Sequence, residues 1–237
     1  MKKAKLGFLS LTDCQGCEFV VLQLGEGLLN LGRDVDFASF RLASSKKASG
    51  PYDVFFIDGA VTTKEEEEVL RKLRSETKVL VALGSCAVDG GVNVVKNYLI
   101  EEGLNPTRLV YGSDVVVESG VARPLDAFVE VDCMIPGCPI SLEEFEAFIK
   151  LLIRGETPKL ERMRVCEDCR MRGVECVTTR GAFCAGPLTL GGCGAPCPAA
   201  GVPCFNCRGP LVNPNHGDWR EMLKQRVKNG GLSFVWR

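Results

Sequence analysis

The sequence lacks an excess of charge of either sign, and it lacks any long apolar run. Its 29 basic and 30 acidic residues give a formal net charge of -1 and a pI of about 6.0. The chain therefore has no basic field of the kind that binds nucleic-acid backbones. A membrane span needs about 18 to 20 apolar residues, whereas runs such as residues 79–83 are short. We expect neither a nucleic-acid partner nor a membrane span.

The N-terminus also lacks a recognisable targeting signal. Two lysines lead directly into the apolar run of residues 4–9, without an h-region, a small-residue cleavage site or a twin-arginine motif. We therefore expect the protein to be cytoplasmic. Cytosolic thiols are kept reduced, and a chain of 237 residues can bury a core without disulfides. Metal binding is the better interpretation of its thirteen cysteines.

Composition divides the chain into two regions. Residues 1–154 alternate apolar runs with helical patterns, whereas residues 159–215 are dense in Cys, Gly and Pro. We predict one domain over 1–154 and a second, Cys-rich domain over 155–237. The second region has too many turn-forming residues for an ordinary core, so bound metal clusters would have to hold it together. A final helix is predicted over residues 218–227, with a role in surface packing only.

The first region has the rhythm of a βαβ fold. Its predicted strands cover residues 4–9, 34–40, 53–57, 78–83 and 129–131, and its predicted helices cover 19–31, 64–74, 92–102 and 142–153. Thr62 or Thr63 should cap the second helix, and Ser141 the last. Strands that alternate with helices predict an α/β fold with a doubly wound, mostly parallel sheet and helices on both faces.

Four cysteines follow three of the predicted strands. Cys14 and Cys17 form a Cys-x2-Cys pair after the first strand, Cys86 follows the strand at 78–83, and Cys138 follows the last strand. Ligand sites in open α/β sheets lie at the carboxyl edge, where these thiols can converge. Four cysteines are a sufficient ligand set for a [4Fe-4S] cluster.

A plainer alternative exists for this first set. Cys86 and Cys138 could be small core residues, with the Cys-x2-Cys pair alone acting as a redox dithiol. The remaining cysteine of this region, Cys133, is most simply a buried free thiol.

The other eight cysteines lie in the second region and can form two four-cysteine sites. The division that is most local along the chain groups Cys166, Cys169, Cys176 and Cys184 in one site, and Cys193, Cys197, Cys204 and Cys207 in the other. Spacing alone leaves an interleaved arrangement open. Zinc is the rival metal, since four-cysteine zinc sites use the same Cys-x2-Cys pairs. Iron–sulfur clusters are favoured because they combine with the first set into an electron path, whereas three structural zinc ions have no evident purpose.

Five short motifs resemble those of the small subunit of nickel–iron hydrogenases, of the cytoplasmic multi-subunit kind that includes sulfhydrogenases and cofactor- or viologen-reducing hydrogenases. They are residues 12–18 (TDCQGCE), 84–87 (GSCA), 137–139 (GCP), 184–187 (CAGP) and 204–209 (CFNCRG). The resemblance covers almost the whole chain. It implies that the first domain is flavodoxin-like and that the second is a small, irregular iron–sulfur domain.

The resemblance also implies a role for each cysteine set. Cys14, Cys17, Cys86 and Cys138 would hold a proximal [4Fe-4S] cluster, Cys193, Cys197, Cys204 and Cys207 a medial one, and Cys166, Cys169, Cys176 and Cys184 a distal one. Many periplasmic relatives have a histidine in the place of Cys166 and lack the ligand that Cys197 supplies. The departure implies two ordinary four-iron clusters in the second domain. The single histidine, His216, is interpreted as a loop residue.

By the same resemblance the function would be electron conduction, through three [4Fe-4S] clusters, between a nickel–iron site and an external redox partner. The nickel–iron site would belong to a large-subunit partner, so this chain would contain no catalytic residues. A further flavin or iron–sulfur subunit would accept the electrons. Two alternatives stay open: a cluster-bearing oxidoreductase subunit of the complex I type, and a structural zinc protein.

Overall fold

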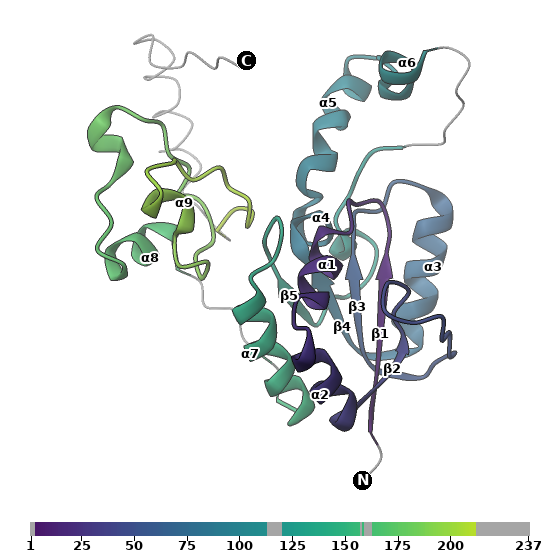
Figure 1. The fold of residues 1–237 in the computed structure, drawn as a ribbon. Coiled ribbons are helices and arrows are strands. Elements are labelled where there is room, and N and C mark those ends of the chain that lie inside the picture. The colour runs from purple at the N-terminus through teal and green to yellow at the C-terminus, as the bar shows by residue number, and fades with distance from the viewer. Residues whose placement is uncertain (1–2, 113–119, 157, 159–162, 212–237) are drawn as a thin grey trace. The chain divides into compact units, whose positions relative to one another are not determined.

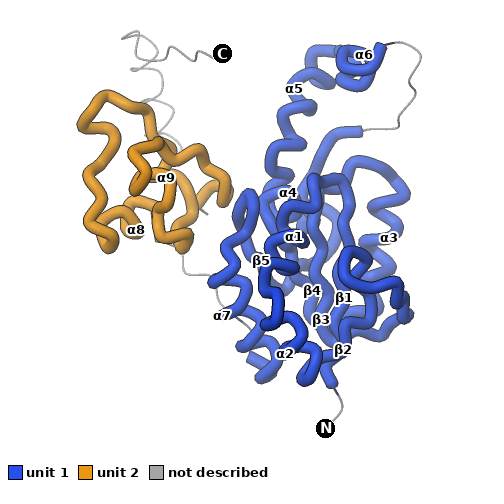
Figure 2. The backbone as a smooth tube through the Cα atoms, in the orientation of Figure 1, with its two compact units in different colours: residues 1–160 blue, residues 161–237 orange. Residues whose placement is uncertain are grey.

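The computed structural model describes residues 3–112, 120–156, 158 and 163–211. Two compact units make up the chain, unit 1 from Met1–Leu160 and unit 2 from Glu161–Arg237 (Figure 2). His216 and the helix predicted over 218–227 lie outside the described residues. Within the described part, no helix is long and apolar enough to cross a membrane.

Unit 1 is built on a five-stranded sheet in which all neighbouring strands are parallel (Figure 1). The order across the sheet is β2-β1-β3-β4-β5. The strands are β1 (Ala4–Ser10), β2 (Val35–Ser39), β3 (Tyr52–Asp58), β4 (Thr77–Leu83) and β5 (Cys133–Ile135). The predicted α/β class with a parallel sheet is therefore confirmed, and the first four predicted strands match within two residues.

The predicted position of the fifth strand was wrong. Residues 129–131 follow a short 3-10 turn, η2 (Leu125–Ala127), and the Val129 N–H still bonds to the Leu125 carbonyl at 3.2 Å. The chain joins the sheet edge only at Asp132, whose N–H donates to the Leu80 carbonyl at 3.0 Å and whose carboxylate accepts from the Leu80 N–H at 2.7 Å. The apolar valines instead pack as partly buried residues against the core.

The helices of unit 1 cover both faces of the sheet (Figure 1). They are α1 (Gly16–Leu22), α2 (Glu26–Asp34), α3 (Lys64–Ser75), α4 (Gly84–Asp89), α5 (Val95–Glu101), α6 (Pro106–Tyr111) and α7 (Leu142–Ile153), with a 3-10 turn, η1 (Gly91–Val94), before α5. One core joins α1, α2 and α7 to one sheet face, where Phe8 stacks on Phe40 and Phe56 at centroid distances of 4.3 and 4.7 Å. The other core joins α3 and α4 to the opposite face.

The single helix predicted over residues 19–31 is in fact two helices. The N–H groups of Leu24 and Gly25 bond to carbonyls three residues earlier, at 3.2 and 3.1 Å, which tightens and ends α1. Gly25 then adopts a φ of 54°, a conformation that favours glycine, and α2 begins at the next residue. The first of the two helices, α1, also begins earlier than predicted, at Gly16, inside the Cys-x2-Cys motif.

The capping of α3 makes a direct stability prediction. Thr63 Oγ1 accepts a hydrogen bond from the Glu66 N–H at 3.2 Å, and the Glu66 carboxylate accepts from the Thr63 N–H at 3.1 Å, which completes a capping box. We expect Thr63→Ala to lower the free energy of unfolding by about 1 kcal/mol. Urea unfolding would measure this, with Thr63→Ser as the control that keeps the hydroxyl. Equal losses in both variants would contradict the capping role.

Unit 2 has little regular structure in its described residues. Its helical segments are α8 (Val165–Met171), η3 (Val177–Arg180) and α9 (Pro196–Ala199), and isolated bridges such as Arg164 with Leu190 hold the chain together. The buried apolar cluster of this unit contains only Val165, Ala195 and Cys204, with other cysteines packed around it. So small a core needs another source of stability.

Candidate metal centres

The first four cysteines all lie at the carboxyl edge of the sheet in unit 1. Cys14 and Cys17 flank the start of α1, just after β1. Cys86 lies in α4, which begins directly at the end of β4, and Cys138 follows β5. The Ser85 N–H donates to the Gly137 carbonyl at 2.9 Å, so the two loops that carry Cys86 and Cys138 are bonded to each other. The structure therefore brings these four residues to one end of the sheet.

Burial and neighbouring charges raise the thiol pKa values at this site. Burial, followed by the charges of Asp58, Cys138, Asp13 and Cys14, raises the pKa of the Cys86 thiol to about 12. Burial also raises the pKa of Cys17, with Asp58 and Cys86 adding to the effect. These thiols hold their protons when no metal is present, and metal binding would have to displace them.

Glycines allow the backbone to pass close to these sulfur atoms. A Cβ atom on Gly84 would overlap Cys17 Sγ, and the φ of +78° at Gly84 disfavours any other residue. A Cβ on Gly91 would lie 3.0 Å from Cys86 Sγ, and one on Gly16 would lie 3.3 Å from Cys14 Sγ. Bare backbone thus lies close beside three of the four thiols. Such a cradle lets backbone N–H groups approach the sulfurs of a bound cluster.

Two buried carboxylate residues, Asp58 and Glu18, and the half-buried Asp13 lie beside this site, and reasoning from the sequence did not predict them. Burial, followed by the charge of Asp13, raises the pKa of Asp58 to about 7. Burial raises the pKa of Glu18, which is only 3% exposed, and that of Asp13. Asp58 ends a buried strand at the same edge as the cysteines, and this position was the available signal.

In unit 2, one set of thiols gathers around α8. Cys166 and Cys169 lie in this helix, and the thiol pKa of each is raised first by burial and then by Cys184 and Cys176, among other charges. For Cys169 the pKa reaches about 11. A Cβ on Gly186 would lie 3.4 Å from Cys184 Sγ and 3.6 Å from Cys166 Sγ. The structure brings these four cysteines together.

The last set is only partly assembled. Burial raises the pKa of Cys193 and of Cys204, and the charge of Cys207 contributes to both. Cys197 lies exposed in α9, and within the described residues its thiol makes no hydrogen bond or electrostatic contact. The Cys204 N–H also donates to Cys184 Sγ at 3.3 Å, across the division that is most local along the chain. The two cysteine sets of unit 2 are therefore neighbours.

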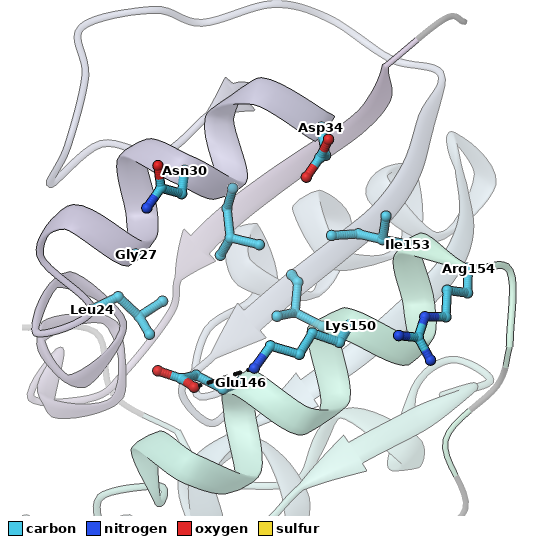
Figure 3. A pocket seen from close by; sticks show the side chains of 10 residues that line it. Leu24, Gly27, Asn30, Asp34, Glu146, Lys150, Ile153 and Arg154 are labelled. Carbon is cyan, nitrogen blue, oxygen red and sulfur yellow. Dashed lines mark hydrogen bonds and ion pairs between the residues drawn. The ribbon is translucent and has the colours of Figure 1, made fainter.

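Two features of unit 1 lie apart from the candidate centres. Cys133 is buried in β5, where it packs in the apolar core. A cavity of about 380 Å³ lies between α2 and α7 (Figure 3), with Leu31 and Ile149 among its apolar lining and Asp34 and Arg154 at its polar rim. None of its lining residues is a cysteine, so this cavity is not part of the candidate centres.

Comparisons with known proteins identify the family. Residues 14–152 match the family of the NADH ubiquinone oxidoreductase 20 kDa subunit. The sulfhydrogenase 2 subunit delta of Pyrococcus furiosus is 38% identical over 223 residues, which cover 93% of this chain and 92% of that one. A subunit of the vhu F420-non-reducing hydrogenase of Methanococcus voltae is 31% identical, over 87% of this chain and 82% of its own.

A solved structure agrees with these relatives. A chain of an NAD+-reducing NiFe hydrogenase in the H2-reduced state superposes with a TM-score of 0.58 at 29% identity, over 68% of this chain and 96% of that chain. The chain described here thus belongs to the NADH ubiquinone oxidoreductase 20 kDa subunit family and, within it, to the small subunits of nickel–iron hydrogenases, which makes it part of an oxidoreductase complex.

Proposed function

We propose that this subunit conducts electrons through three [4Fe-4S] clusters between a nickel–iron site on a large subunit and an external redox partner. The observation that carries the proposal is the convergence of Cys14, Cys17, Cys86 and Cys138 at one sheet edge, within a cradle of glycine backbone. Such clusters, when bound, supply one-electron transfer. The chain supplies the thiol ligands, their burial and the hydrogen bonds around them.

The proposed ligand sets follow the grouping of the thiols. The proximal cluster would be held by Cys14, Cys17, Cys86 and Cys138, the distal one by Cys166, Cys169, Cys176 and Cys184, and the medial one by Cys193, Cys197, Cys204 and Cys207. Two members of the medial set, Cys197 and Cys207, are exposed in the structure. The Cys204 N–H bond to Cys184 Sγ would remain as a hydrogen bond to a ligand sulfur, of the kind that tunes cluster potentials.

The relatives support clusters over zinc ions. They are subunits of hydrogenases, and four cysteines are a sufficient ligand set for a four-iron cubane. Clusters on all three cysteine sets would form one electron path, whereas structural zinc ions carry no electrons.

The relatives separate the hydrogenase role from that of a complex I subunit. The match to the 20 kDa subunit family ends at residue 152, before the eight cysteines of unit 2 begin. The sulfhydrogenase delta subunit matches over 93% of the chain, which includes much of the Cys-rich region. We therefore propose that the chain works in a cytoplasmic hydrogenase, with a large subunit as its catalytic partner and a further flavin or iron–sulfur subunit as its electron acceptor.

An arm formed by α5 and α6 offers a surface for the large subunit. These two short helices extend beyond the carboxyl ends of the strands (Figure 1), and neither contains a buried residue. Tyr98 is 69% exposed, and Val95, Leu109 and Tyr111 are also exposed. Helices of six or seven residues are marginal without packing. A partner that covers these apolar side chains would stabilise the arm.

The base of the arm is joined to the proximal site. Asn93 Nδ2 donates to the Thr12 carbonyl at 3.1 Å, next to the Cys-x2-Cys motif. Asn97 bonds to both the N–H and the carbonyl of Ala122, at 2.8 and 2.9 Å, which fixes the start of α5. Because the arm begins beside Cys86, a partner bound along it would also cover the proximal thiols. We assign this surface to the large subunit.

A charge placed on the arm should weaken this interface. We expect Tyr98→Asp to lower the affinity for the large subunit at least tenfold, because a buried interface tyrosine contributes on the order of 2 kcal/mol. Recovery of the large subunit with the tagged small subunit would measure the loss. Leu29→Asp is the matched control, since Leu29 is an exposed apolar residue on α2. Equal recovery with both variants would remove the arm from the interface.

The conduction role can be tested in the assembled complex. Anaerobic complex exposed to H2 should lose its brown cluster absorbance as electrons enter the clusters, whereas the isolated small subunit should not change. Addition of the large subunit to the isolated chain should restore the response. Bleaching of the isolated chain by H2 would contradict a catalytic site on another subunit.

A further inference from the structure

Two opposite charges are buried beside Cys193 in unit 2. Arg208 is 2% exposed and Asp168 is 4% exposed, whereas most of the described residues of unit 2 are half-buried or exposed. Buried charges of this kind are costly unless other charges and hydrogen bonds offset them. Neither residue is a proposed cluster ligand. Their burial beside a proposed ligand therefore indicates a function other than ligation.

Asp168 connects two cysteine sets. It lies in α8 between Cys166 and Cys169, and its Oδ2 accepts a hydrogen bond from the Gly192 N–H at 2.8 Å. The same oxygen lies 3.8 Å from Cys193 Sγ. Once Cys193 is a thiolate ligand, this close carboxylate oxygen adds a second negative charge next to the sulfur.

Arg208 supplies the balancing positive charge. Its Nε–H donates to the Gly191 carbonyl at 3.0 Å, which fixes the guanidinium beside the loop that carries Cys193. Its charge favours the thiolate of Cys193, whereas that of Asp168 opposes it. Arginine stays protonated at all physiological pH values and is less strongly hydrated than lysine, so it suits a buried site.

We propose that Arg208 and Asp168 are positioning residues that set the reduction potential of the medial cluster, Arg208 raising it and Asp168 lowering it. The inference rests on the proposed function, because it requires a cluster on Cys193. Reduction adds one negative charge to the cluster. A fixed cation nearby stabilises the reduced form more than the oxidised form, and a fixed anion does the opposite, with an effect that is strong where water is excluded.

The test is a redox titration of the assembled hydrogenase, followed by electron paramagnetic resonance at one fixed pH. We expect Arg208→Gln to move one of the three cluster couples to a more negative potential and Asp168→Asn to move the same couple to a less negative one. The proximal couple should keep its potential in both variants, and the distal couple should move only in Asp168→Asn, because the charge of Asp168 also acts on Cys169. Arg208→Lys keeps the positive charge and should leave this couple close to its position in the unmodified protein.

Iron analysis distinguishes a change in potential from loss of the cluster. Arg208→Gln could lose about four irons, the content of one cubane. In that case, full iron content and an unshifted couple in Arg208→Lys would still support the charge role. Loss of the same irons in Arg208→Lys would make Arg208 a packing residue and overturn the inference. A shift in the same direction in both charge variants, or no shift in either, would overturn it as well. Absence of iron from the unmodified protein would instead refute the proposed function.

Discussion

Gly84→Ala should cost the protein its proximal cluster, and with it about four of roughly twelve irons. The new Cβ would overlap Cys17 Sγ, and the methyl group would also face Asp58 Oδ1 at 3.3 Å. The backbone cannot move to avoid this overlap, because Gly84 links β4 directly to α4 and has a φ of +78°. Cys17 would have to leave its place, and a cluster held by four thiols would lose one of them.

Gly155→Ala is the matched control for this substitution. Gly155 has a φ of +77°, nearly the same as that of Gly84, but a Cβ added there meets no atom within 4 Å. Both variants carry the same conformational cost, about 1 kcal/mol, and only Gly84→Ala adds the overlap with sulfur. Iron analysis of both proteins separates the two effects. Full iron content in Gly84→Ala would mean that Cys17 is not a ligand in this position.

The second large effect distinguishes two buried cysteines. Cys86 and Cys133 are 8% and 6% exposed, and burial raises the thiol pKa of both. Only Cys86 lies at the carboxyl edge beside the other proximal thiols, whereas Cys133 packs in the apolar core. We expect Cys86→Ala to lose about four irons and Cys133→Ala to keep all of them.

Because Cys86 and Cys133 are buried to a similar extent, the two variants differ mainly in whether a proposed ligand is removed. Each truncation leaves a small cavity and lowers stability by a comparable amount. Iron and acid-labile sulfide, measured per folded chain, therefore report ligation and not folding. If both variants retained the full complement, Cys86 would be a small core residue. The redox dithiol alternative for Cys14 and Cys17 would then be favoured.

Much of unit 1 could be predicted because its signals are local. The buried apolar runs of β1, β3 and β4, the Thr63 and Ser141 caps and the helix over 142–153 are all present as expected. Two expectations failed where local and tertiary effects compete. Gly25 divides a continuous helical pattern, and Val129 and Val131 read as a strand although a 3-10 turn and the Asp132 bonds delay pairing.

The positions of the unit 1 cysteines could be predicted from the sequence, but the surroundings of these cysteines could not. The parallel sheet brings chain ends from β1, β4 and β5 to one edge, so the positions of Cys17, Cys86 and Cys138 followed from topology. The buried charges did not. For Asp58 the only signal was its place at the end of a buried strand, and for Arg208 there was none. Only the folded chain shows that each is buried beside a thiol.

Iron, acid-labile sulfide and zinc content of anaerobically prepared protein tests the central claim most directly. Electron paramagnetic resonance of the reduced sample would accompany the analysis. The proposed ligand sets predict about twelve irons and twelve sulfides per chain, with no stoichiometric zinc, as three four-iron cubanes require. Roughly four irons with two zinc ions per chain would contradict the account, since zinc would then occupy both four-cysteine sites of unit 2.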